Sequence, residues 1–406
     1  MYGASCFRRK PTPGAGSWLS RVAVSIGRVA VALFLAVGIG HAAHAQGFET
    51  SAKQAILIDQ ETGAILFEKN ADELFQPSSM AMLMTLEVVF DALKKGEVTD
   101  DQTIRISEHA WRTGGAPAGR TTMFAELKSE VPIIDLIRGV IVHIANDGAI
   151  ALAEGLAGSE QAFAERMNTR ARELGLSRSH FTNPTGYEDP KQWVTARDLA
   201  RLARHLIRDY PDRYPLFATP EFTWNDIFQR AKNTLIAANF GVDGLMVGGA
   251  SEKELGAVVS AARDGHRLIL AFYGLPSKAE REKQAKALFN WGFSNFGDIT
   301  LFGDGETVGE ARVFGGTDTY VPLVGKGAVK AYMDLESRKG YRARIVYTGP
   351  VRAPVTKGDR IGHLEITRDK APVQNIPLYA ARSIEVGGFS QRARDGLIEA
   401  LAGLWY

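Results

Sequence analysis

Two pairs of strand-like segments enclose a long helical stretch, and this order is the feature that most constrains the fold. Residues 55–59 and 64–67 are apolar and flank Gln60-Glu61-Thr62-Gly63, which predicts a β-hairpin closed by a glycine-containing turn. Residues 255–262 and 266–273 are joined by Arg263-Asp264-Gly265, and an Asp-Gly turn favours a second hairpin. The order predicts an α+β fold in which both hairpins join one antiparallel sheet covered by helices.

The stretch between the hairpins carries helix signals. Residues 79–95 contain no glycine or proline and end at Gly96, which predicts the first helix. Residues 129–215 are mostly helical, with apolar segments at 133–142 and 149–156 that Asn146-Asp147-Gly148 interrupts. Thr195-Ala196-Arg197-Asp198 is similar to a capping box and opens a further helix. A last helix over residues 279–291 closes a first domain, residues 46–296.

A second domain follows, and its residue pattern differs from that of the first. From Asp298 to about Val386, short β-branched runs alternate with glycine-rich turns at roughly 8–12-residue intervals, which predicts a small all-β domain over residues 297–388. Residues 389–406 are expected to form an amphipathic helix with several apolar side chains on one face: Leu397, Leu401, Leu404 and Trp405. Such a helix either lies on a membrane surface or packs on the β domain, and both alternatives remain open.

The N-terminal segment has the pattern of a signal peptide. Residues 1–45 contain five basic residues and no acidic one, an apolar run at 29–39 and the small-x-small sequence Ala43-His44-Ala45. We therefore expect cleavage near Gln46 and a periplasmic location, with peripheral contact to the inner membrane left open. The alternative, an uncleaved anchor, would normally need about 20 apolar residues.

The composition of the mature chain excludes several functions. Without the signal, 43 basic residues stand against 46 acidic ones, a balance that argues against nucleic-acid binding. Cys6 is the only cysteine and lies in the signal segment, so no disulfide is expected in the mature protein. No His, Cys and acidic spacing fits a metal site and no glycine-rich loop fits a phosphate, so neither a metal nor a cofactor is expected.

Three segments that are far apart in the sequence have the form of one active site. Ser79 lies at the start of the first predicted helix, where helix-end N–H groups can stabilise an oxyanion, although a serine there is commonly an N-cap. The second segment, residues 141–148, contains Asn146, which alternatively has a structural role between its helices. The third, residues 242–248, leads to the second strand pair.

The residues around these segments resemble those of the low-molecular-mass penicillin-binding D,D-carboxypeptidases, whose motifs are S-x-x-K, S-x-N and K-T-G. The resemblance includes residues 111–117 and 201–210 and extends to the terminal helix. It implies a penicillin-binding/β-lactamase-like transpeptidase domain followed by a small β domain. In this family a serine attacks the bond between two D-alanines of a peptidoglycan stem peptide, and β-lactams acylate the same serine. The resemblance implies that Ser79 is the nucleophile, Asn146 the second-motif asparagine, and Gly248 and Gly249 substrate-binding residues.

Four catalytic positions of the family carry apolar residues in this chain. Met82 stands in place of the lysine base, Ile144 in place of the second-motif serine, and Met246 and Val247 in place of the third-motif lysine and threonine. We call these the four replaced positions. A thioether accepts no proton at neutral pH, and a positioned general base contributes roughly 10²–10⁴-fold to a rate. Gln192 also occupies a position where the family usually has histidine.

Two functions therefore remain open. The first is a periplasmic serine D-Ala-D-Ala carboxypeptidase of cell-wall synthesis or remodelling with impaired activity. The second, which the four replaced positions favour, is a non-catalytic pseudoenzyme that binds peptidoglycan or an envelope enzyme. Met82 and Met246 could alternatively line a pocket for an uncharged ligand, because methionine is adaptable. The expected partners are a peptidoglycan stem peptide, a β-lactam at Ser79 and a membrane surface at the C-terminal helix.

Overall fold

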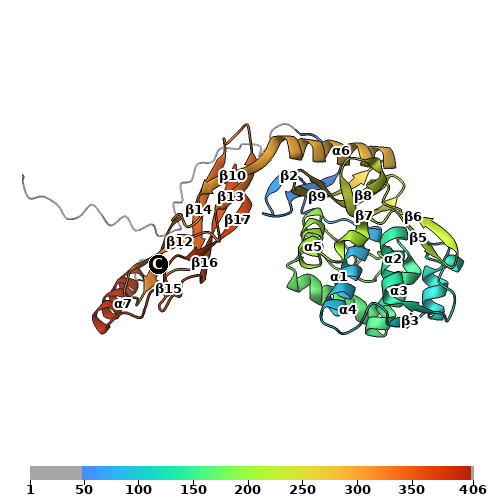
Figure 1. The fold of residues 1–406 in the computed structure, drawn as a ribbon, viewed down its shortest axis with the longest axis horizontal. Coiled ribbons are helices and arrows are strands. Elements are labelled where there is room, and N and C mark those ends of the chain that lie inside the picture. The colour runs from blue at the N-terminus through green and yellow to red at the C-terminus, as the bar shows by residue number, and fades with distance from the viewer. Residues whose placement is uncertain (1–47, 404–406) are drawn as a thin grey trace, which may run out of the picture. The chain divides into compact units, whose positions relative to one another are not determined.

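The computed structural model describes residues 48–403 (Figure 1). The expected signal peptide and its cleavage site near Gln46 lie outside these residues. Within the described range, none of the helices combines the length and the apolar character that a membrane crossing requires.

A five-stranded antiparallel sheet forms the centre of the first domain. Its strand order is β2-β1-β9-β8-β7, with bounds Gln54–Asp59 for β1, Ile65–Lys69 for β2, Val242–Ser251 for β7, Glu254–Arg263 for β8 and His266–Leu275 for β9. The pairing of β1 with β9 confirms that the two predicted hairpins meet in one sheet. In the β8–β9 turn both Asp264 and Gly265 have positive φ, as a two-residue hairpin turn requires. Strand β7 adds an edge that the sequence did not predict.

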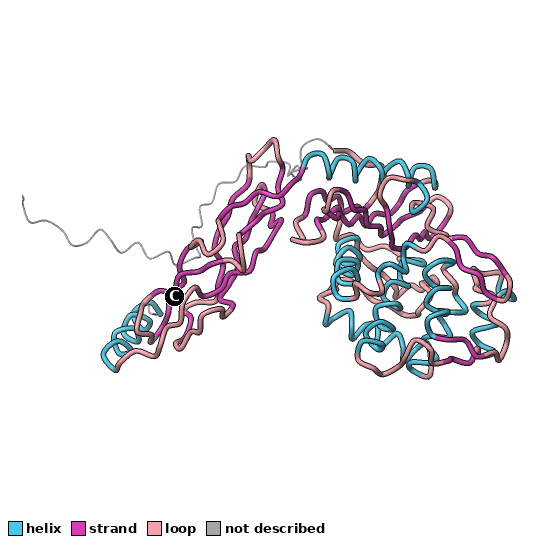
Figure 2. Tube along the Cα trace, in the orientation of Figure 1, coloured by secondary structure: helices cyan, strands magenta, loops and turns pink. Residues whose placement is uncertain are grey.

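Helices cover both faces of this sheet. In Figure 1 the helix α6 (Lys278–Asn295) runs along one face, and α5 (Ala196–Asp209) lies against the other with α1 (Met82–Lys94) beyond it. Figure 2 shows the same layers as cyan helices on either side of magenta strands. The remaining helices are α2 (Ile133–His143), α3 (Asn146–Ala157) and α4 (Glu160–Glu173). One buried hydrophobic cluster joins the sheet to these helices.

The helix boundaries differ from the predicted ones at two places. A 3-10 turn, η1 (Ser78–Ala81), precedes α1, so the first helical stretch begins at Ser78. Asn146-Asp147-Gly148 does not interrupt the helices, because these residues form the first turn of α3. The break lies at Ile144, whose positive φ of 57° ends α2. The N-cap prediction at Thr195 is confirmed, since its side chain accepts a hydrogen bond from Asp198 N.

Short elements connect the main ones. Two small antiparallel sheets pair β3 (Thr103–Arg105) with β4 (Glu130–Pro132) and β5 (Glu221–Trp224) with β6 (Ile227–Arg230). Single helical turns are η2 (Ala110–Gly114), η3 (Ala116–Ala118), η4 (Tyr214–Ala218) and η5 (Ile236–Ala238).

The second domain is built from strands, as predicted. β10 (Phe296–Phe302) pairs with β13 (Val329–Asp334), and a six-stranded sheet has the order β14-β16-β17-β12-β11-β15. The bounds of its strands are Gly309–Phe314 for β11, Tyr320–Val324 for β12, Tyr341–Tyr347 for β14, Val351–Arg352 for β15, Arg360–Arg368 for β16 and Ala371–Ala380 for β17. The domain has a hydrophobic cluster of its own.

The C-terminal helix α7 (Phe389–Gly403) begins against the β domain. The Asp395 carboxylate is buried and accepts a 2.9 Å hydrogen bond from Gly315 N. Gln391 Nε2 donates to Thr317 O at 3.1 Å. The first turns of α7 are therefore fixed by hydrogen bonds to the β domain, whereas Arg392 and Arg394 are exposed.

Candidate active site

Ser79 lies inside the η1 turn and is partly exposed. The residue at the N-cap of this turn is Pro77, and no side chain caps it. Ser79 therefore does not act as an N-cap, because it lies within the turn and not at the extended position before it. Within the described part of the chain its hydroxyl makes no hydrogen bond. Ser78 has a φ of 48°, an uncommon conformation for a residue other than glycine.

Gly248 brings the third segment directly against Ser79's turn. A Cβ atom at Gly248 would lie 3.1 Å from Pro77 O and 3.2 Å from Met80 N, both backbone atoms of the η1 region. At Gly249 a Cβ would lie 2.7 Å from Glu254 O, across the β7–β8 pair. A larger residue at position 248 would push β7 away from η1, so glycine there permits the close approach.

The loop before Tyr187 closes on the same turn. Gly186 has a φ of +80°, and a Cβ atom on it would collide with the carbonyl oxygen of Ser78. The buried side chain of Gln192 shapes this loop: its Oε1 accepts from Thr182 N at 3.2 Å and its Nε2 donates to Tyr187 O at 2.9 Å. Gln192 therefore has a positioning role for the backbone beside η1.

Asn146 uses its amide group to hold a neighbouring loop. Both its backbone N and its Nδ2 donate to Thr121 O, at 2.9 Å and 2.8 Å. Its Oδ1 accepts no hydrogen bond from the described residues. Helix α3, which begins with Asn146, packs against α1, which follows Ser79. The second segment is thus joined to the first through a helix–helix contact.

Asp147 is a buried carboxylate that the sequence analysis did not single out. Its side chain accepts from the Thr122 hydroxyl and from three backbone N–H groups, those of Met123 at 3.0 Å, Ala125 at 3.2 Å and Gly148 at 3.0 Å. Burial raises the pKa of Asp147, and these hydrogen bonds oppose the rise. The sequence predicts Asp147 in a turn between helices, where Asp commonly bonds only to neighbouring backbone, so its sequence position gives no sign of this loop-holding role.

The four replaced positions are all buried in the hydrophobic core. Their exposed fractions are 0% for Met82, 8% for Ile144, 1% for Met246 and 5% for Val247. All four belong to the same hydrophobic cluster, so their side chains have a packing role. The two lysines at the C-terminal end of α1 are engaged elsewhere. Lys94 donates to Asp209 O, and Lys95 forms an ion pair with Asp91.

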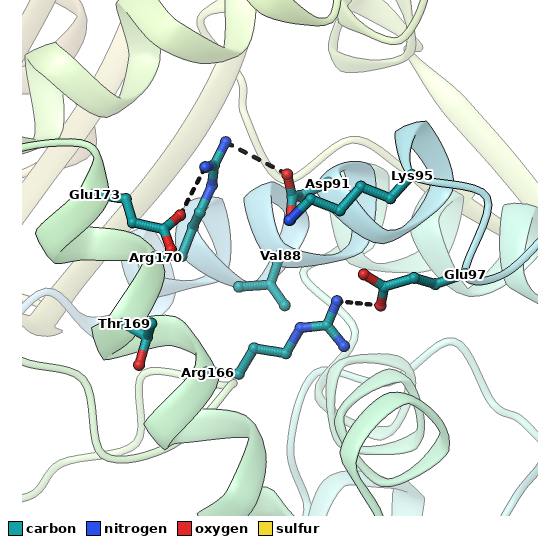
Figure 3. Close-up of a pocket in the computed structure, with 8 residues that line it drawn as sticks. All are labelled: Val88, Asp91, Lys95, Glu97, Arg166, Thr169, Arg170 and Glu173. Carbon is teal, nitrogen blue, oxygen red and sulfur yellow. Dashed lines mark hydrogen bonds and ion pairs between the residues drawn. The ribbon is translucent and has the colours of Figure 1, made fainter.

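A cavity of about 310 Å³ lies between α1 and α4 and is lined by none of the four replaced positions (Figure 3). Its charged side chains pair with one another: Arg166 with Glu97 at 2.6 Å, and Arg170 with Glu173 at 2.9 Å. None of the expected site residues lines it. Because these charges are paired within the protein, we interpret them as stabilising the contact between α1 and α4 and not as a ligand site.

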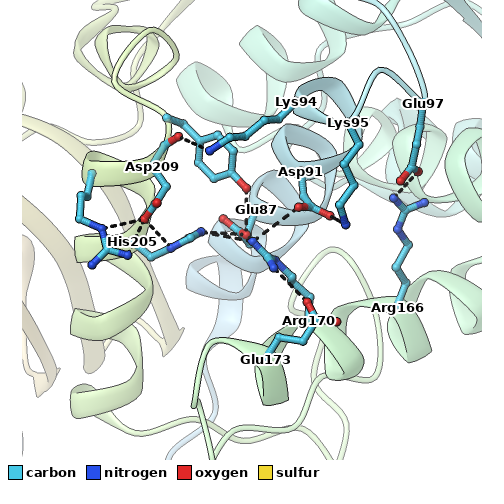
Figure 4. A network of polar contacts seen from close by, with 12 residues as sticks. Glu87, Asp91, Lys94, Lys95, Glu97, Arg166, Arg170, Glu173, His205 and Asp209 are labelled. Atoms are coloured by element: carbon cyan, nitrogen blue, oxygen red, sulfur yellow. Dashed lines mark hydrogen bonds and ion pairs between the residues drawn. The ribbon is translucent and has the colours of Figure 1, made fainter. Parts of the chain in front are cut away.

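Glu87 connects this region to the helix that carries the site (Figure 4). Its buried carboxylate on α1 accepts from Arg170 Nε at 2.8 Å and from the Tyr210 hydroxyl at 3.1 Å, and His205 Nε2 lies 3.1 Å from the same oxygen. These partners come from α4 and from the C-terminal end of α5. The network therefore fixes α1, and with it the position of the η1 turn.

A second polar cluster fixes the start of β7. The Arg267 guanidinium donates to both carboxylate oxygens of Asp243 at 2.7 Å, and the Tyr214 hydroxyl donates to Asp243 at 2.7 Å. Burial raises the pKa of the Tyr214 hydroxyl. Asp243 lies five residues before Gly248, so this cluster helps to hold the strand that contacts η1. Among the described residues, no cluster of His, Cys, Asp and Glu side chains could hold a metal ion.

Comparison with known proteins decides the family. The profile of the D-alanyl-D-alanine carboxypeptidase family, Peptidase_S11, matches residues 40–276, and that of the penicillin-binding protein 5 C-terminal domain matches residues 296–386. The chain belongs to the D-alanyl-D-alanine carboxypeptidase family. Its relatives include DacA of Haemophilus influenzae, 32% identical over 88% of this chain and 91% of DacA. DacC of Escherichia coli is 33% identical over 85% of this chain and 87% of DacC.

Solved structures of family members have the same fold. Penicillin-binding protein 5 from Haemophilus influenzae matches with a TM-score of 0.72 and 32% identity, over 84% of this chain and 99% of that one. Penicillin-binding protein 6B from Escherichia coli matches with a TM-score of 0.64 and 28% identity, over 82% and 96%. These matches confirm the α+β transpeptidase domain followed by a β domain. The family consists of D-Ala-D-Ala carboxypeptidases that act on peptidoglycan peptides and bind β-lactams.

Proposed function

We propose that this family member binds peptidoglycan stem peptides in the periplasm with little or no carboxypeptidase activity. One observation supports this proposal above the others. The residue three positions after Ser79 is a fully buried methionine, and the Ser79 hydroxyl has no hydrogen-bond partner in the described part of the chain.

The chemistry of the serine explains why this observation matters. A serine hydroxyl is a weak nucleophile unless an adjacent base takes its proton. Removing a positioned base costs roughly 10²–10⁴-fold in rate. Because catalytic groups act as a unit, the losses at Ile144, Met246 and Val247 need not multiply that factor. The absence of a base at position 82 is thus sufficient for a severe loss of activity.

Peptide binding is favoured by the parts of the candidate site that remain. The close approach of Gly248 to η1 keeps backbone groups of β7 beside Ser79. Asn146 retains an amide oxygen without a partner among the described residues. A stem peptide is extended and rich in amide groups, and an edge strand such as β7 can pair with an extended peptide backbone.

Two further proposals concern location. The charge pattern of residues 1–45 and the cleavage sequence at 43–45 favour export to the periplasm. The exposed Arg392 and Arg394 near the start of α7 favour contact with an anionic membrane surface. Vesicle co-sedimentation of the full mature chain and of a chain ending before Phe389 would test the second proposal. Equal sedimentation of both would contradict it.

The proposed function is tested by measuring cleavage and binding on the same samples. The mature protein and its Ser79→Ala variant are incubated with a stem-peptide mimic that ends in D-Ala-D-Ala. Released D-alanine is quantified, and binding is measured by calorimetry. We expect equal, background release from both proteins and binding by both. Release that depends on Ser79 would show that the chain is an active carboxypeptidase, whereas an absence of binding would refute the peptide-binding role.

A further inference from the structure

Arg120 lies beside the loop backbone that the site's asparagine holds. It directly precedes Thr121, whose carbonyl oxygen accepts both hydrogen bonds from Asn146. The side chain of Arg120 is exposed, and within the described part of the chain it pairs with no carboxylate. Its guanidinium carbon lies 4.6 Å from the centre of the Tyr187 ring. Arg120 therefore carries a positive charge that has no ion-pair partner among the described residues.

Tyr187 is held firmly enough to serve as a platform for this cation. Its backbone N donates to Asn183 Oδ1 at 2.9 Å, its carbonyl accepts from Gln192 Nε2 at 2.9 Å, and its hydroxyl donates to Thr113 O at 3.0 Å. Burial raises the pKa of Tyr187 to about 12, so the ring stays neutral at physiological pH. Hydrogen bonds at three points leave the ring little freedom to move away from Arg120.

The Arg120–Tyr187 pair connects both sides of the candidate site. Tyr187 follows Gly186, which touches the carbonyl of Ser78 next to Ser79. Arg120 precedes Thr121, which Asn146 binds. The two residues are 67 positions apart in the sequence, and their contact closes the distance between the loops that flank Ser79 and Asn146. The positive charge of Arg120 therefore lies near any peptide that binds at Ser79 or Asn146.

A guanidinium held over an aromatic ring, as that of Arg120 is over Tyr187, suits a carboxylate. When its face lies on an aromatic ring, the N–H donors in its plane remain free, and their fork matches the two oxygens of a carboxylate. The aromatic contact also fixes the guanidinium and lowers the entropy that binding would cost. In the third segment the family's cation is absent, since Met246 is apolar and buried.

We propose that Arg120, oriented by Tyr187, is the anion-binding residue of the candidate site and binds the terminal carboxylate of a bound peptide. The proposal rests on the peptide-binding function above and names the group that recognises the peptide end. It predicts that the chain distinguishes a peptide with a free C-terminal carboxylate from the same peptide with a C-terminal amide. Loss of a charged hydrogen-bond donor should reduce affinity for the free acid about 10- to 100-fold.

The test measures this preference by calorimetry with a D-Ala-D-Ala stem-peptide mimic and its C-terminal amide. The proteins are the mature chain, Arg120→Gln, Tyr187→Leu and Arg112→Gln. Arg112 is a matched control because it is also exposed and lies over the Trp111 ring, but it is already paired with Glu108 at 2.7 Å. Thermal midpoints of all four proteins are recorded to show that each is folded.

The expected result is a preference for the acid in the mature chain and in Arg112→Gln, loss of that preference in Arg120→Gln and a smaller preference in Tyr187→Leu. An unchanged preference in Arg120→Gln would overturn the assignment of Arg120 while leaving peptide binding intact. Equal affinity of the mature chain for the acid and the amide peptide would also overturn the assignment of Arg120 and leave peptide binding intact. If the mature chain binds neither peptide, both the proposed function and this inference fail.

Discussion

Replacing Met82 by lysine tests directly whether this position belongs to the core or to an open cleft. Met82 is 0% exposed and opens α1, three residues after Ser79. The resemblance to the family's S-x-x-K motif predicts a lysine at this position. In this chain we expect Met82→Lys to be strongly destabilising, because the surroundings of residue 82 belong to a hydrophobic cluster.

The magnitude follows from the burial. A fully buried methionine side chain contributes about 1.5–3 kcal/mol relative to an exposed one. An amine without a hydrogen-bond partner at the same place costs about 1–3 kcal/mol more. Met82→Lys should therefore lower the free energy of unfolding by about 2.5–6 kcal/mol. The matched control Met82→Leu conserves volume and apolar character and should cost less than about 1.5 kcal/mol.

The assay is urea unfolding of the mature protein, Met82→Lys and Met82→Leu, followed by circular dichroism. Desolvation lowers the pKa of a buried lysine, so the unfolded state would bind the additional proton at neutral pH. The deficit of Met82→Lys should therefore shrink as the pH rises toward the range where a free lysine loses its proton. Met82→Leu should show no such pH-dependent difference from the natural chain.

Equal stability of the lysine and leucine variants would refute this reasoning. It would mean that water or a carboxylate reaches residue 82, and that the site is more open than the buried cluster indicates. If the free energy of unfolding of Met82→Lys stays below that of the natural chain by the same amount at every pH, the lysine amine is not desolvated as we expect.

Three other predictions concern the same site. Ser79→Ala should change the free energy of unfolding by less than about 0.5 kcal/mol, because its hydroxyl makes no hydrogen bond in the described part of the chain; a larger loss in urea unfolding would contradict this. Asp147→Asn should cost about 2–4 kcal/mol because it disturbs a buried acceptor of four hydrogen bonds, while the exposed control Asp212→Asn should cost less than about 0.5 kcal/mol; similar losses would contradict it. The quadruple variant Met82→Lys, Ile144→Ser, Met246→Lys and Val247→Thr should take up labelled penicillin at reduced stability, and no single one of these changes should suffice. A folded quadruple variant that takes up no label would contradict this prediction.

Local patterns predicted much of the first domain. The hairpins β1–β2 and β8–β9 follow from apolar runs that end at turn residues, and Asp264-Gly265 adopts the positive φ angles that its sequence favours. The helix start at Thr195 follows from a side-chain cap that acts within three residues. Signals of this kind depend only on neighbouring residues, so they can be recognised in the sequence.

Features that depend on distant contacts could not be predicted in this way. Strand β7 contains three glycines and is extended because it pairs with β8, so its own residues give a weak strand signal. The break between α2 and α3 falls at Ile144, a β-branched residue that rarely adopts positive φ. Asn-Asp-Gly was the more obvious turn sequence.

The same distinction applies to the candidate site. The family motifs led to Ser79, Asn146 and Gly248, and the fold places Gly248 against the turn of Ser79. Their roles in binding and catalysis remain predictions. The contact between Arg120 and Tyr187 has no local signal, because it joins two loops that meet only in the folded chain.

The most direct test of whether the candidate site is catalytically inactive is the intact mass of the mature protein after incubation with excess penicillin. Acylation of Ser79 would add the mass of one penicillin to each chain. Without a base at position 82, we predict an unchanged mass for the natural chain, the same as for Ser79→Ala. A stoichiometric adduct on the natural chain that is absent from Ser79→Ala would show that Ser79 is still an activated nucleophile, and it would contradict the proposed loss of catalysis.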